Sequence, residues 1–298
     1  MIKGIRPRGK THYGQARVTA AESPRPVPHR PAAPRRRAPP STFKLVSAVM
    51  YDAMMAETIT LIGHDDDAIE AYSARPLGPG PYGGVVVLHH LPGYDEATKE
   101  IVRTFAARGY LAICPNLHYR EAPGASPDDA SAAVRNVGGV PDDRLVGDVA
   151  AAARYLRTQT SSNGKVGTIG YCSGGRQSFL AACSLRLDAA VDCYGGFVVR
   201  ELPDDFPIRL SVRPLVDLAP QLSCPLLGLF GTEDQNPSPE ETAELGNVLT
   251  KAGKTYEFHT YPNAGHAFFS VDRPSYRYDA AKDGWQRVFD FFGRYLGG

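Results

Sequence analysis

Apolar and polar positions along residues 57–297 follow two periods, which predicts strands alternating with helices. Residues 57–62 and 68–76 alternate around the polar turn "GHDDD", a pattern typical of an antiparallel hairpin. Residues 83–90, "GGVVVLHH", form a continuous apolar run between glycines and the next loop, as in a strand buried on both faces of a parallel sheet. Residues 95–108 instead place apolar side chains at helical spacing, and Gly109 ends that helix.

The alternation continues to the end of the chain, with long loops expected at 116–141 and 197–224. Further strands are predicted at residues 110–115, 165–171, 188–196, 225–231 and 255–261. Further helices are predicted at residues 142–159, directly after 172, at 238–253 and at 278–296. This order predicts an α/β fold, with a mainly parallel central sheet and helices on both faces. Such sheets carry their sites at the carboxyl ends of the strands.

Composition narrows the class of protein. The chain has 298 residues, 43% of them hydrophobic and 22% charged, as in an ordinary globular protein. Its apolar runs have the length of strands, so we expect no membrane span, and its N-terminus lacks the apolar core of a secretory signal. Five cysteines without a CxxC pair argue against a disulfide framework and a zinc site, and for the cytoplasm. We therefore predict no metal and no cofactor.

The net charge of +1 conceals a split between two parts of the chain. Residues 1–40 hold ten Lys and Arg against one acid, which leaves 23 bases and 31 acids, a net −8, for residues 41–298. We predict a basic, Pro/Arg-rich, disordered extension at residues 1–50 and one domain at residues 51–298. A nucleic-acid or membrane arm, or a transit peptide, is the alternative reading of that extension. The acidic domain gives no electrostatic reason to bind nucleic acid.

Three predicted strands end in residues with reactive side chains. Cys172 lies in "GYCSGGR", Asp234 in "GTED" and His266 in "AGHAFF". Nucleophile, acid and histidine in this chain order are typical of α/β-hydrolases. Each residue alone is a weak signal, because a cysteine in a Gly-rich turn is more often a packed small side chain and an Asp after a strand is often a helix cap. Glu233 is the alternative acid.

Together the three residues predict covalent catalysis. Cys172 would be the nucleophile at a strand-to-helix turn, His266 would move the proton, and Asp234 would orient the histidine. The backbone N–H groups of Leu91 and Ser173 are the predicted oxyanion hole.

Several segments resemble the dienelactone hydrolase (carboxymethylenebutenolidase) family of α/β-hydrolases. They are "ARPLGPGPYGGVVVLHHLPG", "RGYLAICPNLHYREAPG", "VGTIGYCSGGR", "CYGG", "CPLLGLFGTEDQNPSP" and "YPNAGHAFF". The resemblance implies a cysteine nucleophile and hydrolysis of an ester or enol-lactone through an acyl-thioester. It aligns His90 with a family glutamate, Arg120 with one carboxylate-binding arginine and Ser270 with the other, so His90 and Arg120 are the expected substrate contacts. Arg273 is close enough in sequence to replace the second arginine.

Two functions from different classes follow from these residues. The first is an esterase or lactonase, a monomer or homodimer that acts on a small-molecule ester or lactone. The alternative is a non-hydrolytic thiol sensor or binding protein on the same scaffold, in which Cys172 is oxidised. His89 and His118 are candidates for the mouth of the pocket, without forming a metal set.

Overall fold

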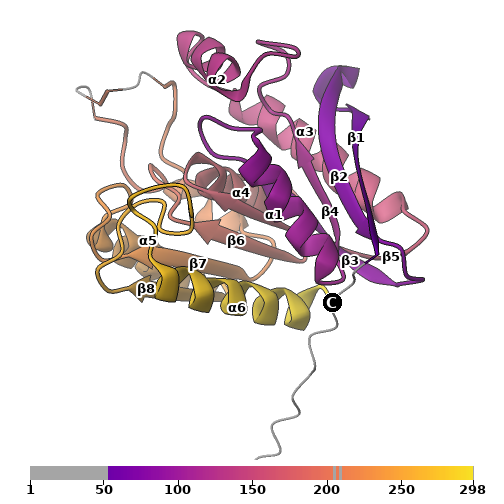
Figure 1. Ribbon diagram of the computed structural model, residues 1–298. Helices are drawn as coiled ribbons and strands as arrows, with labels where there is room; N and C mark the ends of the chain where they lie inside the picture. The colour runs from indigo at the N-terminus through magenta and orange to yellow at the C-terminus, as the bar shows by residue number, and fades with distance from the viewer. Residues whose placement is uncertain (1–52, 204–205, 208–209, 298) are drawn as a thin grey trace, which may run out of the picture. The chain divides into compact units, whose positions relative to one another are not determined.

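The protein is built around one mostly parallel sheet. The computed structural model describes residues 53–203, 206–207 and 210–297. The eight strands lie in the order β1-β2-β4-β3-β5-β6-β7-β8, and only the pairs β1/β2 and β2/β4 are antiparallel. The strands are β1 (Met54–Ile62), β2 (Ala68–Pro76), β3 (Tyr82–Leu88), β4 (Leu111–Pro115), β5 (Ser162–Tyr171), β6 (Ala189–Cys193), β7 (Leu226–Gly231) and β8 (Tyr256–Tyr261). The predicted opening hairpin and the parallel remainder are both confirmed (Figure 1).

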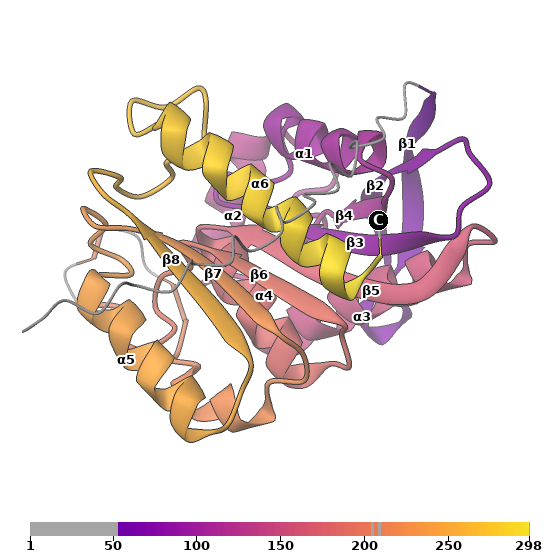
Figure 2. The same cartoon turned by 90° about the horizontal axis from the view of Figure 1, so that it is seen from below.

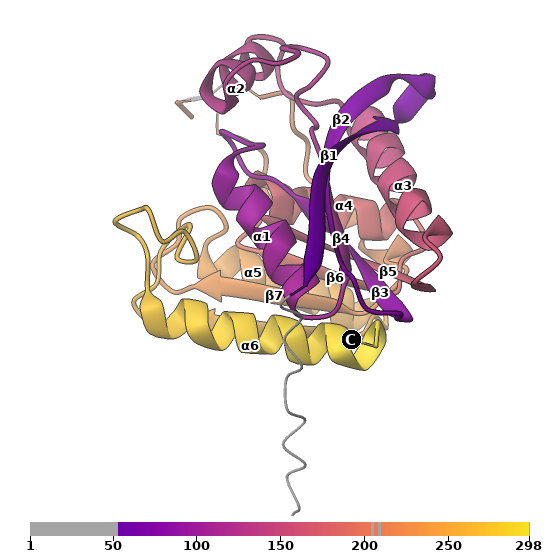
Figure 3. The ribbon, with the colours of Figure 1, turned by 45° about the vertical axis from the view of Figure 1, so that its right-hand side comes forward.

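Helices cover the sheet on both faces, as expected. They are α1 (Glu96–Ala107), α2 (Pro127–Asn136), α3 (Asp142–Thr158), α4 (Ser173–Ser184), α5 (Pro239–Lys251) and α6 (Tyr278–Tyr295), with the 3-10 turns η1 (His64–Asp66) and η2 (Val216–Gln221). α1 and α6 bury Phe105 and Phe292 against one face, whereas α3, α4 and α5 pack on the other (Figures 2 and 3). β3 is buried along its whole length, because both faces are covered.

The long loops differ from the expectation. Residues 116–141 contain α2, which begins where the Ser126 side chain accepts a hydrogen bond from the Asp129 N–H and where Pro127 occupies the first turn. The helix is short and buries only small residues and Val134 on its inner face, so its periodicity was too weak to predict it. Residues 197–224 contain η2. The predicted extension, residues 1–50, lies outside the described residues.

The predicted "GGVVVLHH" strand ends two residues early, at Leu88. His89 and His90 therefore begin the loop at the carboxyl edge of the sheet. The same edge holds the ends of β5, β6, β7 and β8, because all of them run parallel to β3. Residues that follow these strands are brought together there.

Two glycines allow α4 to start directly against the strand ends. A Cβ on Gly170 would lie 1.8 Å from the carbonyl oxygen of Gly174, and a Cβ on Gly174 would lie 2.2 Å from the carbonyl oxygen of Leu88. Both distances are far shorter than any van der Waals contact, and the opposing atoms are backbone. The "G-x-C-x-G" spacing is thus a packing requirement for the turn between β5 and α4.

We expect Gly170→Ala to lower the free energy of unfolding by at least about 3 kcal/mol, because backbone must move to admit the methyl group. Urea unfolding followed by circular dichroism measures the change. Gly293→Ala in α6 is the matched control, since a Cβ there meets no atom within 4 Å. An exposed helical Gly→Ala change should stabilise by about 1 kcal/mol. Equal stability of the two variants would contradict the packing argument.

Candidate active site

Cys172 occupies the sharp turn between β5 and α4. Its backbone has φ 57° and ψ −121°, in the left-handed region that residues with a Cβ seldom adopt. Its N–H donates to the carbonyl of Cys193 at 3.0 Å, which fixes the turn to the end of β6. Cys172 is also the residue that precedes the first turn of α4, where the helix dipole favours a negative charge. The side chain is partly exposed, whereas the other four cysteines are buried.

His266 is held from behind by Asp234. The Nδ1 atom of His266 lies 2.9 Å from Oδ2 of Asp234, which is 2% exposed. The other carboxylate oxygen, Oδ1, accepts the N–H of Asn236 at 2.9 Å. The alternative acid, Glu233, is exposed to solvent. The carboxylate that meets the histidine is therefore Asp234, and its two hydrogen bonds fix the orientation of the imidazole.

The surroundings of His266 favour its protonated form. Burial lowers its pKa, but hydrogen bonds and charge interactions with Asp234 and Cys172 outweigh burial and raise the pKa to about 10. Since Nδ1 is engaged by Asp234, the remaining ring nitrogen, Nε2, is the one available to the thiol. With its pKa raised to about 10, His266 is an imidazolium at neutral pH, in the same cavity as the sulfur of Cys172.

The two N–H groups predicted as an oxyanion hole flank this thiol. Leu91 lies in the loop after β3, and Ser173 is the first residue of α4, where helical N–H groups lack an intrahelical acceptor. Within the described part of the chain, neither N–H donates to another backbone carbonyl. Both are therefore free to donate to a ligand oxygen.

A small cavity of about 70 Å³ adjoins Cys172, His266 and Leu91. The residues that line it are His90, Leu91, Tyr171, Cys172, Tyr194, His266, Ala267, Ser270 and Arg273. The ring of Tyr194 packs edge-on against His266, with 5.1 Å between ring centroids. Of the sequence-predicted contacts, the cavity includes His90 and not Arg120. Arg273, for which the sequence offered only proximity, does line it.

A family model described as the dienelactone hydrolase family matches residues 69–296 of this chain. The chain belongs to the dienelactone hydrolase family. A proposed carboxymethylenebutenolidase of Escherichia coli is 36% identical over 265 residues, which cover 87% of this chain and 95% of that protein. The carboxymethylenebutenolidase of Pseudomonas putida is 30% identical over 244 residues, which cover 80% of this chain and 96% of that protein. This member of the dienelactone hydrolase family is accordingly a hydrolase.

Solved structures agree with this assignment. A proposed dienelactone hydrolase from Klebsiella pneumoniae superposes with a TM-score of 0.71 at 30% identity, covering 82% of this chain and all of that one. An acylaminoacyl peptidase from Pyrococcus horikoshii has a TM-score of 0.62 at 17% identity and covers 82% of this chain and 42% of its own. The second likeness shows the α/β-hydrolase fold alone.

Arg120 does not contact the substrate cavity, contrary to its predicted role. Its guanidinium donates to both carboxylate oxygens of Asp148, at 2.8 and 3.0 Å, and to Asp67 at 2.7 Å. Asp148 is fully buried in α3, so this bidentate pair satisfies a charge that would otherwise be isolated. Arg120 therefore fastens the β1–β2 turn to α3 and is not among the residues that line the small cavity.

His90 stands at the cavity as a neutral side chain. Burial lowers its pKa, and the nearby Arg273 lowers it further, against the opposing effect of Asp95, whose Oδ2 is 3.6 Å from Nε2. A neutral imidazole donates or accepts a hydrogen bond without adding a charge. His90 is thus suited to a polar contact with a substrate.

His89 and His118 do not line the small cavity, because both are buried, His89 in the loop after β3 and His118 in the loop after β4. Nε2 of His89 accepts the Leu117 N–H at 3.1 Å, so its Nδ1 carries the proton and faces the carbonyl of His90 at 3.1 Å. The ring of His118 packs edge-on against that of His89, at 4.6 Å. The two histidines support the loop that carries His90 and Leu91. No group of three metal-ligating side chains occurs among the described residues.

Sequence reasoning missed two tyrosines that line the cavity. Tyr194 directly follows β6, and Tyr171 is the last residue of β5. The rule that sites lie at the carboxyl ends of parallel strands could have indicated Tyr194, which lies near the end of the strand predicted at residues 188–196. Tyr171 gave no such signal, because a tyrosine before the turn reads as an ordinary buried strand residue.

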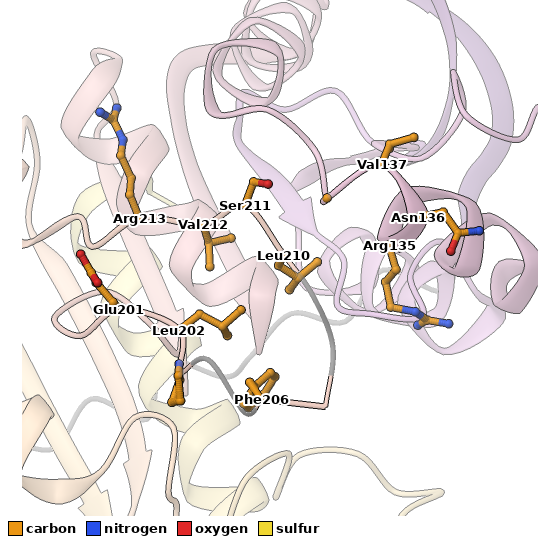
Figure 4. A pocket seen from close by; sticks show the side chains of 12 residues that line it. Arg135, Asn136, Val137, Glu201, Leu202, Phe206, Leu210, Ser211, Val212 and Arg213 are labelled. Atoms are coloured by element: carbon orange, nitrogen blue, oxygen red, sulfur yellow. The ribbon is translucent and has the colours of Figure 1, made fainter.

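A larger cavity of about 940 Å³ lies elsewhere, between the end of α2 and residues 201–203, 206 and 210–213. Figure 4 shows Arg135 and Asn136 on one side of it and Glu201, Leu202 and Phe206 on the other. None of Cys172, Asp234 and His266 lines it. Along the described residues, no helix has both the length and the apolar character to cross a bilayer.

We expect the buried His118 to make stability depend on pH. Burial, reinforced by Arg144 and Arg135, lowers its pKa to about 4, against 6.5 in the unfolded chain. Between these values the unfolded chain binds more protons, so stability is full above pH 6.5 and decreases as the pH falls towards 4. This one group should lower the free energy of unfolding by about 3 kcal/mol over that pH range.

The measurement compares urea unfolding of the wild type and His118→Gln at pH 7 and pH 4.5. The comparison is needed because buried Asp192, whose pKa is raised to about 7, changes stability in the opposite direction over the same range. Asp192 is present in both proteins, so its contribution cancels in the difference between their free energies of unfolding. The wild type should lose stability relative to the variant at pH 4.5, and a constant difference would contradict the assignment.

Proposed function

We propose that this protein hydrolyses a carboxylic ester or enol-lactone through Cys172, His266 and Asp234, with an acyl-thioester intermediate. The observation that carries the proposal is a chain of contacts at one edge of the sheet. Cys172, at a strained turn, lines the same small cavity as His266 and raises the pKa of its imidazole, and His266 in turn meets buried Asp234 at 2.9 Å. Nucleophile, base and orienting acid in this arrangement support nucleophilic catalysis.

Acylation begins when the sulfur of Cys172 attacks the carbonyl carbon. The carbonyl π electrons move to oxygen, and the N–H groups of Leu91 and Ser173 donate to the resulting oxyanion. When the oxyanion collapses, the bond to the leaving oxygen breaks, and Nε2 of His266 gives that oxygen its proton. Preformed N–H donors of this kind are typically worth about 3 kcal/mol each in the transition state.

Deacylation reverses the roles. His266, now neutral, takes a proton from water as the water oxygen attacks the thioester carbon. Collapse of the second oxyanion expels the thiolate of Cys172 and releases the acid. Asp234 stays ionised throughout and stabilises the imidazolium that forms in each half of the cycle.

Arg273 and His90 supply the polar contacts to the rest of the substrate in this proposal. Both line the catalytic cavity, and neither participates in the proton transfers. Arg273 is the one arginine in that lining, so a carboxylate on the substrate would meet a single cation there. A simple ester without a carboxylate satisfies the same site.

We expect Cys172→Ala to lower kcat for p-nitrophenyl acetate by at least about 10³-fold, because Cys172 is the one thiol that lines the small cavity with His266. Release of p-nitrophenol followed by absorbance measures it. Cys224→Ala is the matched control, since Cys224 is a buried thiol outside the cavity. Undiminished turnover by Cys172→Ala would sink the proposal.

The pH dependence separates an ion-pair mechanism from a general-base mechanism. With the pKa of His266 at about 10, its proton is present at neutral pH and lost as the pH rises through 10. If the imidazolium must protonate the leaving oxygen, kcat/KM falls above about pH 10. If neutral His266 must first deprotonate the thiol, kcat/KM instead rises towards pH 10.

We expect kcat/KM to fall above about pH 10. Initial rates on p-nitrophenyl acetate from pH 6 to 10.5, corrected for spontaneous hydrolysis, decide the question. Asp234→Asn provides the control, because removal of the carboxylate charge should move that limb to lower pH. A limb that stays in place in the variant would argue that another group titrates.

A further inference from the structure

A third cavity adjoins the small cavity beside Cys172. It is distinct from the cavity near α2, and the reaction proposed above does not use it. It measures about 600 Å³ and lies between α1 and α6, on the face of the sheet that these two helices cover. Four side chains line both cavities: His90, Tyr171, Tyr194 and Ser270. The space therefore begins at the residues that surround Cys172. We refer to it as the aromatic groove.

Aromatic rings form the inner wall of the aromatic groove. The ring of Phe269 lies between those of Tyr171 and Trp285, edge-on to both, at 5.7 and 5.8 Å. Trp285 and Phe289 then stack, with ring centroids 5.5 Å apart. Trp285 and Phe289 are only partly buried, whereas Phe291 and Phe292 of the same helix are fully buried. These rings offer apolar surface to a flat ligand.

The hydroxyl of Tyr171 is a second observation that points to a ligand. Tyr171 is 6% exposed and lines both cavities, yet its hydroxyl has no hydrogen-bond partner among the described residues. A buried hydroxyl in a folded protein is normally satisfied. An oxygen of a bound molecule, near the junction of the two cavities, would satisfy it.

The position of His266 indicates which part of an ester lies in the groove. His266 must protonate the leaving oxygen, so the leaving group departs on its side. His266 lines the small cavity but not the aromatic groove, and its side chain is 37% exposed. The leaving group therefore has a direct route to solvent, and the acyl group is the part that remains to occupy the groove.

We propose that the aromatic groove is the acyl-binding site of this hydrolase and that it selects esters whose acyl chain carries an aromatic ring. The inference rests on the proposed function for the identity of the reacting bond. A volume of about 600 Å³ is that of a site for a drug-sized molecule, whereas an acetyl group would leave almost all of it empty. A phenyl ring joined to the acyl carbon by a two-carbon linker tests this selection, because ring–ring contacts with Trp285 and Phe289 would favour it over an aliphatic chain.

The kinetic test compares p-nitrophenyl 3-phenylpropanoate with p-nitrophenyl acetate. We expect kcat/KM for the aryl ester to exceed that for acetate by at least tenfold, which corresponds to burial of the ring. Thr104→Phe introduces a large side chain into the groove and should lower this ratio at least fivefold. Thr60→Phe, on the exposed face of β1, is the matched control and should leave the ratio unchanged. A wild-type ratio of one or less would overturn the proposal, as would a ratio that Thr104→Phe does not alter.

A binding test separates the groove from the chemistry. Trp285 is the single tryptophan of the chain, so a ring bound beside it changes the intrinsic fluorescence directly. We expect 3-phenylpropanoate to change the emission of both the wild type and Cys172→Ala in a saturable manner, and propanoate to do so only at much higher concentration. Thr104→Phe should weaken this binding and Thr60→Phe should not.

The two tests fail in distinguishable ways. Saturable binding of 3-phenylpropanoate without hydrolysis of either ester supports the groove and contradicts the proposed function. Hydrolysis of acetate that depends on Cys172, without saturable binding of the aryl acid and without preference for the aryl ester, supports the proposed function and overturns the groove. Equal affinity for propanoate and 3-phenylpropanoate would also overturn it.

Discussion

The contact between α4 and the ends of β3 and β5 is the constraint on which the active site depends. Glycines at 170 and 174 let the backbone of the helix start where any Cβ would collide with a carbonyl. That approach places Cys172 in a positive-φ turn and at the start of a helix at the same time. One packing requirement therefore supplies three properties: an outward-facing thiol, a helix dipole that favours its anion, and the free N–H of Ser173 beside it.

The electrostatics of the site follow from what this turn faces. The catalytic cavity is lined by Arg273 and two histidines, and no carboxylate is among its lining residues. Asp234 lies behind His266, where it raises the pKa of the imidazole without facing the substrate. His90, where the family resemblance implies a glutamate, adds no negative charge, and burial lowers its pKa and so disfavours a positive one. The cavity is thus suited to developing negative charge on sulfur and on a carbonyl oxygen.

Sequence reasoning was strongest where parallel-sheet topology controls position. Cys172, Asp234 and His266 each follow a strand, and parallel strands end at one edge, so a one-dimensional order could be converted into proximity. It was weakest for long side chains whose partners are distant in sequence. Arg120 aligned with a substrate-binding residue, but its direction depends on Asp148 in α3 and Asp67 in a turn. Arg273 had the opposite outcome: no periodicity in its loop indicates that it lines the cavity.

The aromatic residues of α6 explain why a ligand groove is hard to recognise in a sequence. Trp285, Phe289 and Phe292 share one helical face, and that spacing predicts packing against the sheet. Phe292 does so: it is fully buried and lies against Gly167, in the middle of β5. Trp285, two turns earlier, lies beside Tyr171 at the carboxyl end of the same strand and stays partly exposed. The same face of one helix is therefore core at one end and cavity wall at the other, and the difference is set by distance from the catalytic edge, which helical periodicity does not encode.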